Sequence, residues 1–272
     1  MARSLVVVGV GGLAISVVCL SLASVFSPNR GYSFPYSSQS HCDGGWGGSR
    51  PWAGRTPFAE SGDIVSRDFS WNGGTRVDIC IPATVYYSPG PAWQVSVTGP
   101  ESSVDGLRID DGQIYFDGAS TYSDPSSLEV RITGPALESF GLRGSGTLIL
   151  ENLAQETLEV DLFGSGSVHG QGTVGNLTLR IFGSGNADLA GVATGDVDTT
   201  LFGSGNADVA PTGDVEVLTF GSGDVRLHSR PKHVSKKSLG SGRIIQLDRG
   251  QGSAEGTASS APTPPGNVAE QS

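Results

Sequence analysis

The sequence predicts an all-β protein, a single-stranded parallel β-helix with coils of about 19 residues, on three observations. The triplet Gly-Ser-Gly begins at residues 144, 164, 183, 203, 221 and 240, and such regular spacing indicates a solenoid. Glycine makes up 41 of the 272 residues and only 16% of residues are charged, which is typical of short strands joined by tight turns. Apolar residues alternate with polar ones between the turns, as in strands.

Each repeat consists of a strand, a Gly-Ser-Gly corner, a second strand and a short return. Glycine tolerates positive φ, so such a corner turns the chain without a Cβ clash. Stacked repeats pair each strand with its equivalent one coil on, at an interstrand spacing of about 4.8 Å. Coils of this length leave no room for a helix on every turn, which excludes a leucine-rich horseshoe. The corner glycines are Gly144, Gly146, Gly164, Gly166, Gly183, Gly185, Gly203, Gly205, Gly221, Gly223, Gly240 and Gly242.

A phenylalanine stands directly before four successive corners, at equivalent positions of the repeat. We expect the rings to stack as a ladder along the axis, each offset pair adding about 0.5–1.5 kcal/mol beyond its burial. If the ring of Phe182 is buried, its replacement by alanine should cost roughly 3–5 kcal/mol. The predicted ladder consists of Phe163, Phe182, Phe202 and Phe220.

The ends of the chain differ in composition from the repeats. Residues 4–27 carry no charge and are mostly apolar, so residues 1–27 are either a signal peptide or an uncleaved membrane anchor, and both alternatives stay open. Residues 28–57 are rich in glycine, serine and proline and are expected to form a linker. Residues 251–272 have almost no apolar content and are expected to be disordered.

The β-helix domain is expected to span residues 58–250. Its first part, residues 58–133, contains alternating lead-in strands separated by Gly, Pro and Asp-Gly breaks. Its second part, residues 134–250, carries the Gly-Ser-Gly repeats. Lys236 and Ser238 occupy apolar positions of the repeat, which indicates that the coils end there.

The chain contains three cysteines, of which Cys19 lies in the apolar first segment. Cys42 and Cys80 follow that segment, and an oxidising compartment would permit a disulfide between them. The sequence does not establish the geometry of this pair, so the bridged and the reduced form both stay open.

The charge pattern argues against nucleic acid as a partner. The net charge is −10, whereas binding to phosphates needs a basic footprint. Lys232, Lys236 and Lys237 nevertheless lie within six residues, beside Arg230 and His233. We interpret them as a solvated basic edge at one end of the fold, with an anionic polymer or lipid surface as the alternative contact.

No catalytic, metal or cofactor site is predicted. The six corner serines recur without a repeated histidine, whereas a serine nucleophile needs a base and an orienting acid. We therefore interpret them as a column of hydroxyls that satisfies backbone groups of the corners. Asp188 and Asp208 recur one coil apart, but their Asn-Ala-Asp setting departs from the calcium-binding nonapeptide. A lyase or hydrolase built on these two carboxylates lacks an arginine or lysine in the same coils.

Lead-in strands and corners together resemble the "putative auto-transporter adhesin head", or GIN-domain, family of exported bacterial proteins. The similarity extends over about residues 60–248. It is carried by RVDICIPATVYYSPGPAWQVSV, LRIDDGQIYF and LEVRITGPALESFGLRGSGTLIL, followed by the spaced Gly-Ser-Gly triplets. The resemblance implies a right-handed β-helix and a location in the cell envelope.

We therefore predict a non-enzymatic, exported module that presents a binding surface at the cell envelope, either in the periplasm or on the cell surface. Its partner is expected to be a surface ligand, a glycan or an envelope protein, and residues 4–27 are expected to contact the membrane. One alternative is a structural envelope protein that self-associates through its coil ends. Another is a polysaccharide lyase or hydrolase.

Overall fold

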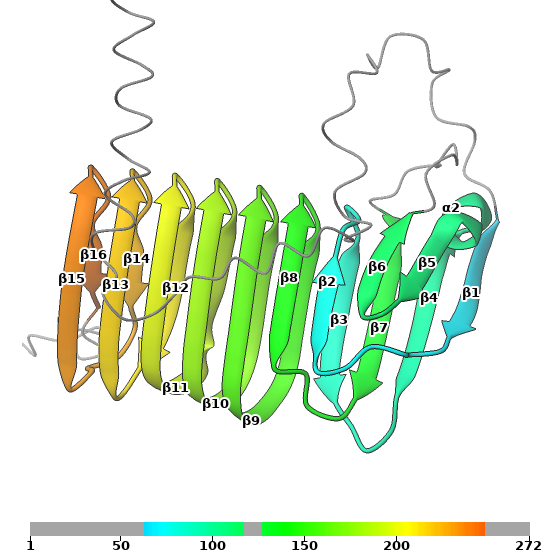
Figure 1. Ribbon diagram of the computed structural model, residues 1–272, viewed down its shortest axis with the longest axis horizontal. Helices are drawn as coiled ribbons and strands as arrows, with labels where there is room; N and C mark the ends of the chain where they lie inside the picture. Colours follow the sequence, from blue (N-terminus) through cyan, green and yellow to red (C-terminus); the bar gives the residue numbers. More distant parts are fainter. Residues whose placement is uncertain (1–62, 117–126, 248–272) are drawn as a thin grey trace, which may run out of the picture. The chain divides into compact units, whose positions relative to one another are not determined.

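The computed structural model describes residues 63–116 and 127–247, which form sixteen strands and one short helix (Figure 1). The predicted all-β class is confirmed. The elements in chain order are β1 (Ile64–Phe69), β2 (Arg76–Ile79), β3 (Thr84–Pro89), β4 (Gln94–Pro100), α2 (Glu101–Gly106), β5 (Leu107–Asp110), β6 (Gln113–Phe116), β7 (Glu129–Gly134), β8 (Ser139–Gly144), β9 (Thr147–Gly164), β10 (Ser167–Gly183), β11 (Asn186–Gly203), β12 (Asn206–Pro211), β13 (Asp214–Gly221), β14 (Val225–Leu227), β15 (His233–Gly240) and β16 (Ile244–Gln246).

Strands β9, β10 and β11 each follow the chain from one corner to the next. They pair in parallel with one register shift in each pairing, near Gly170, and the segments that run into the corners are in register, so that Phe182 faces both Phe163 and Phe202. The glycines that begin the corners keep the same register, with Gly183 between Gly164 and Gly203. This stacking in register confirms the parallel β-helix (Figure 1).

The coils form two walls around the core. Wall 1 contains the strand segments that run into the corners, in the order β5-β6-β2-β8-β9-β10-β11-β13-β15. Wall 2 contains the segments that leave the corners, in the order β1-β4-β7-β3-β9-β10-β11-β12-β14-β16. Strands β9, β10 and β11 contribute to both walls, because the first part of each lies in wall 2 and the last part in wall 1.

The lead-in strands continue the solenoid. Strand β2 pairs in parallel with β8, and β3 pairs in parallel with β9, so these two strands form a coil without a Gly-Ser-Gly triplet. Beyond them the pairing becomes antiparallel, with β4 between β1 and β7, and β5 against β6. Helix α2 follows β4 and buries Val104 in the core. Residue 134 therefore marks a change of sequence pattern within a continuous sheet.

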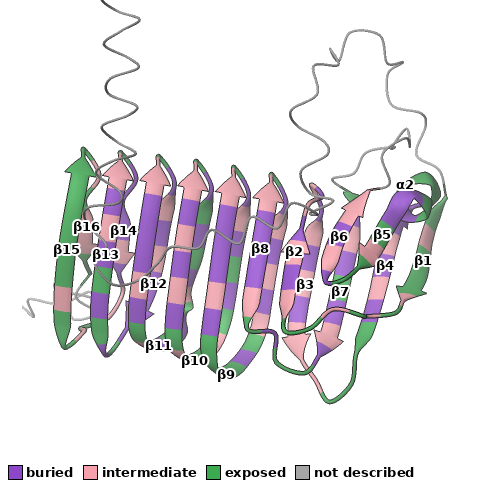
Figure 2. Ribbon diagram, in the orientation of Figure 1, coloured by how far each residue is buried: buried purple, intermediate pink, exposed green. Residues whose placement is uncertain are grey.

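Strict alternation along the strands fills the core (Figure 2). In β10, Leu177, Leu179 and Ile181 are buried, whereas the residues between them are half-buried and face outward. Each fully buried aliphatic side chain contributes about 1.5–3 kcal/mol relative to an exposed one. The columns of such residues along the axis are therefore the main source of stability of the solenoid.

The last coil ends the apolar columns. Lys236 follows Val217 in register and Ser238 follows Thr219, so polar residues replace buried ones at these inward positions. Every residue of β15 is exposed except the half-buried Val234 (Figure 2). The chain thus closes its core with a polar coil.

Candidate binding surface

The first glycine of each corner has a left-handed backbone. Its φ lies between +104° and +138° at all six corners, a region that residues with a Cβ rarely occupy. The serine that follows donates its backbone N–H to the carbonyl of the first glycine one coil back, for example from Ser204 to Gly183 at 2.9 Å. Corners therefore stack through the main chain.

The second glycine of each corner has a different reason to be glycine. A Cβ added at Gly205 would lie 2.1 Å from the carbonyl oxygen of Gly185, and one at Gly223 would lie 1.8 Å from that of Gly205. These positions are buried between successive coils, so a side chain would force the coils apart. Both glycines of the triplet are thus structural.

The serine between them faces solvent at all six corners. Because the corner amides already donate to carbonyls of the preceding coil, these hydroxyls are not needed to satisfy the corner backbone. The expectation that they would do so is therefore wrong. The exposed column consists of Ser145, Ser165, Ser184, Ser204, Ser222 and Ser241.

The four phenylalanines lie outside the core, on the outer face of wall 1. Their rings stack nearly parallel, with centroids 5.0, 5.4 and 4.6 Å apart and interplanar angles of 5–6°. All four are half-buried, because the preceding residue of each strand points inward. The estimated cost of Phe182→Ala applied only to a buried ring, and this condition is not met.

Both ends of the phenylalanine stack are covered. The guanidinium carbon of Arg143 lies 5.0 Å from the ring centroid of Phe163, a cation–π contact. At the other end Leu239 follows Phe220 in register. The ring faces are therefore occupied by neighbours, and only ring edges point to solvent.

An ion-pair network lies beside the ladder and joins three strands of wall 1, β2, β9 and β10. Arg76 on β2 contacts Asp78 at 2.9 Å and Asp161 on β9 at 3.6 Å. Arg180 on β10 binds the other oxygen of Asp161 at 3.0 Å and also contacts Glu159. The side chain of Asp161 is only 6% exposed, and this burial raises the pKa of its carboxyl although Arg180 lowers it.

A glycine makes room for this network. A Cβ on Gly141, which lies on β8 between Asp78 and Asp161 in the sheet, would come within 2.1 Å of the Asp78 carboxylate. Sequence analysis missed the network because Arg76 and Asp161 are far apart in the chain. The pairing of β2 with β8 was the only signal, and no short motif reveals it.

The outer face of wall 2 carries side chains that bridge successive coils. The side-chain oxygen of Asn186 accepts a hydrogen bond from the Asn206 amide nitrogen at 2.9 Å. Asn206 then accepts the backbone N–H of Asp224 at 3.1 Å, and Asp224 accepts that of Arg243 at 2.9 Å. The hydrogen bonds from Arg243 hold the pKa of Asp224 below its usual range.

Asp188 and Asp208 neighbour each other on wall 2 but have different partners. Asp188 lies 3.8 Å from His169, whereas Asp208 contacts His228 at 2.6 Å and Arg226 at 3.3 Å. The coils of these two carboxylates contain no arginine or lysine, but Arg226 contacts Asp208 from one coil on. Within residues 63–116 and 127–247, no group of His, Cys, Asp and Glu could hold a metal ion.

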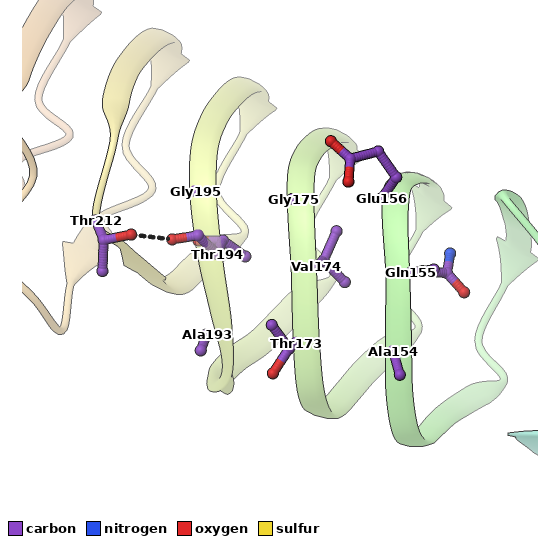
Figure 3. A pocket seen from close by; sticks show the side chains of 10 residues that line it. All are labelled: Ala154, Gln155, Glu156, Thr173, Val174, Gly175, Ala193, Thr194, Gly195 and Thr212. Atoms are coloured by element: carbon purple, nitrogen blue, oxygen red, sulfur yellow. Dashed lines mark hydrogen bonds between the residues drawn. The ribbon is translucent and has the colours of Figure 1, made fainter.

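A shallow hollow of about 520 Å³ lies where the coils bend from wall 2 back to wall 1 (Figure 3). It is lined by small residues of successive coils, such as Thr173, Gly175 and Ala193. Thr212 donates its hydroxyl to the carbonyl of Thr194 at 2.8 Å. Glu156 is the one charged side chain lining it in the part of the chain that the structure describes, so polar groups do not converge there.

Cys80 takes part in a disulfide. Cys42 lies outside the described residues, so the pairing of Cys42 with Cys80 stays a prediction.

A comparison with models of protein families shows to which family the chain belongs. The model of the family described as "Putative auto-transporter adhesin, head GIN domain" matches residues 75–231, which extend from the coil of β2 and β3 beyond β14. The chain belongs to this family. No curated protein matches the chain.

Several solved structures are similar to this one. A putative adhesin from Bacteroides fragilis is 19% identical with a TM-score of 0.58, and the alignment covers 68% of this chain and 97% of that chain. A putative lipid binding protein from Parabacteroides distasonis is 18% identical with a TM-score of 0.42, over 68% of this chain and 97% of that chain. At such identity the B. fragilis structure supports the fold alone.

None of the helices among the described residues is long and apolar enough to span a bilayer. The apolar segment 4–27 lies outside those residues, so the signal peptide and the membrane anchor both stay predictions.

Proposed function

We propose that this GIN-domain protein is a non-enzymatic, adhesin-like module of the cell envelope, which binds its partner with the outer face of wall 1. The observation that carries the proposal is the contrast between neighbouring columns on that face. A column here is the set of residues that occupy one position of the repeat in successive coils. The phenylalanine column keeps aromatic rings through four coils, whereas the outward-facing column two residues before it in the chain changes at every coil. That second column runs Gly141, Asp161, Arg180, Thr200, Leu218 and Lys237.

The uniform ladder column is explained by contacts between coils, whereas the varied column is explained so only in part, by the pairing of Asp161 with Arg180. The phenylalanines stabilise one another, so their repetition needs no ligand. A varied row of charged, polar and apolar groups on a flat wall provides the specific chemistry that recognises a protein surface. The family and the spread of polar groups over an open face support binding rather than catalysis.

The geometry of the ladder favours a protein partner over a glycan on wall 1. A sugar that packs against an aromatic residue covers the face of the ring. Here each face is taken by the next ring, by Arg143 or by Leu239, so only edges remain for contact.

Binding can be tested with two matched variants on β10. Thr178→Arg places a long charged side chain on the outer face of wall 1, and Ser167→Arg places the same group on wall 2. Both positions are half-buried and face outward. Cells displaying the full-length protein should lose adhesion to a protein-coated surface with Thr178→Arg and keep it with Ser167→Arg. Equal adhesion of both variants, or retention on glycan-coated surfaces only, contradicts the proposal.

Location is tested separately by adding protease to intact cells. An adhesin-like module on the cell surface should be cut in residues 28–57, while a periplasmic control protein stays intact. Protection until the outer barrier is breached would place the module inside the envelope, and the adhesin-like role would then be wrong.

A further inference from the structure

The two ends of the solenoid carry opposite charges. At the end formed by β15 and β16, residues 225–247 contain six lysines and arginines and no acidic residue. At the end formed by β1, α2 and β5, six exposed carboxylates accompany two arginines, Arg67 and Arg108. The six acidic residues are Asp63, Asp68, Glu101, Asp105, Asp110 and Asp111.

Several of these end charges have no partner within the described residues. Lys232 and Lys236 form no ion pair there, and neither do Asp63 and Asp68. Charges along wall 1 behave differently, as the pairing of Arg180 with Asp161 shows. Both ends thus carry unpaired charge, which can meet another molecule.

Exposed apolar side chains gather at the same two ends. Of the four exposed large hydrophobic residues in the described ranges, Ile64 lies on β1 and is 63% exposed, and Leu239 lies on β15 and is 55% exposed. Leu247, directly after β16, is 38% exposed. Such residues combined with unpaired charges are typical of interaction surfaces.

Both ends also present open strand edges. Among the described strands, β15 pairs only with β13 and β16 only with β14, while β1 pairs only with β4 and β5 only with β6. An edge with free N–H and C=O groups is a template for further pairing. Lysines on an edge strand can prevent its pairing with another strand. The lysines at the β15 end would repel another basic edge, but they would attract an acidic one.

We propose that the protein associates head to tail, with the basic end of one copy docked on the acidic end of a second copy. Contact between two basic ends or between two acidic ends is repulsive, which disfavours a two-fold dimer. Contact between unlike ends is heterologous, and it extends into an open row of copies where the rotation between neighbours does not close a ring. This inference goes beyond the binding surface of wall 1, which would stay exposed along the row.

The test uses the full-length protein in mild detergent, followed by sedimentation velocity over a range of concentrations at low and at high salt. The wild type should form a concentration-dependent series of oligomers that dissociates as salt screens the ends. Lys232→Glu with Lys236→Glu should raise the dissociation constant at least about tenfold, and Asp63→Lys with Asp68→Lys should do the same. Glu138→Lys with Asp188→Lys reverses two exposed charges on the flank and should leave association unchanged.

Mixing the two end variants gives the sharpest outcome. Each variant alone keeps only one unaltered end and should remain monomeric. In an equimolar mixture the unaltered acidic end of one variant can dock on the unaltered basic end of the other, so the two variants should associate as a heterodimer. Recovery in the mixture also shows that both variants are folded. A monomeric wild type, association that survives both reversals, or a mixture that stays monomeric overturns the proposal. Association only after removal of residues 248–272 would assign that tail to the basic end and overturn it as well.

Discussion

Phe182 lies in the middle of the ladder, and its replacement by alanine tests how much the outward stack contributes to stability. The ring stacks on Phe163 at 5.0 Å and on Phe202 at 5.4 Å. Two such contacts are together worth about 1–3 kcal/mol. Because the ring is half-buried, the loss of burial adds roughly 1 kcal/mol, about half the value of a buried phenylalanine. We expect Phe182→Ala to lower the free energy of unfolding by about 2–4 kcal/mol.

Phe220 provides the matched comparison, because it stacks on one ring only, Phe202 at 4.6 Å, and has Leu239 on its other side. Phe220→Ala should therefore cost about 0.5–1.5 kcal/mol less than Phe182→Ala. Urea denaturation followed by circular dichroism measures both. An unchanged stability of Phe182→Ala, or an equal loss for both variants, would refute the stacking argument.

Three further predictions concern the corners, the ion-pair network and catalysis. Gly205→Ala should lower the free energy of unfolding by about 1–3 kcal/mol because its Cβ meets the preceding coil, whereas Ser204→Ala should change it by less than about 0.5 kcal/mol in the same urea titration. Burial raises the pKa of Asp161, so its folded form holds the proton more tightly than the unfolded form, and its contribution to stability is present below about pH 4 and is lost as pH rises through the folded value. The stability of wild type relative to Asp161→Asn should therefore decline as pH rises from about 4 in urea titrations, and a difference independent of pH contradicts this. Incubation of the protein with acidic polysaccharides should release no cleavage product, as measured by chromatography of the digest. A product that forms with the wild type and is lost with Asp188→Ala would contradict this prediction.

The repeat was predictable because its cause is local. Gly-Ser-Gly needs positive φ at the first glycine and close approach at the second, and both requirements recur at every coil. The same spacing placed Phe163 and Phe182 in one column. Their outward direction was also present in the sequence, since Leu162 and Ile181 before them are the inward residues of an alternating strand. The estimate for a buried Phe182 ring did not take this alternation into account.

The ion-pair network could not be predicted, because its residues meet only through the topology. Arg76 reaches Asp161 across Gly141, and this requires knowing that β2 pairs with β8 and β8 with β9. The contact of Arg226 with Asp208 has the same origin, as each residue lies on a different coil. Side chains that pair across coils carry no signal in a short stretch of sequence.

A stacked repeat constrains its columns unequally, and this decides where a partner can be recognised. Inward columns must stay apolar, corner columns must stay glycine, and the ladder column holds itself together by stacking. The outward columns beside the ladder meet none of these demands, so Thr178 can stand where Glu159 stands one coil earlier, and Thr200 where Arg180 stands one coil earlier. Regularity of the fold and specificity of binding can therefore coexist on one wall, because different columns provide them.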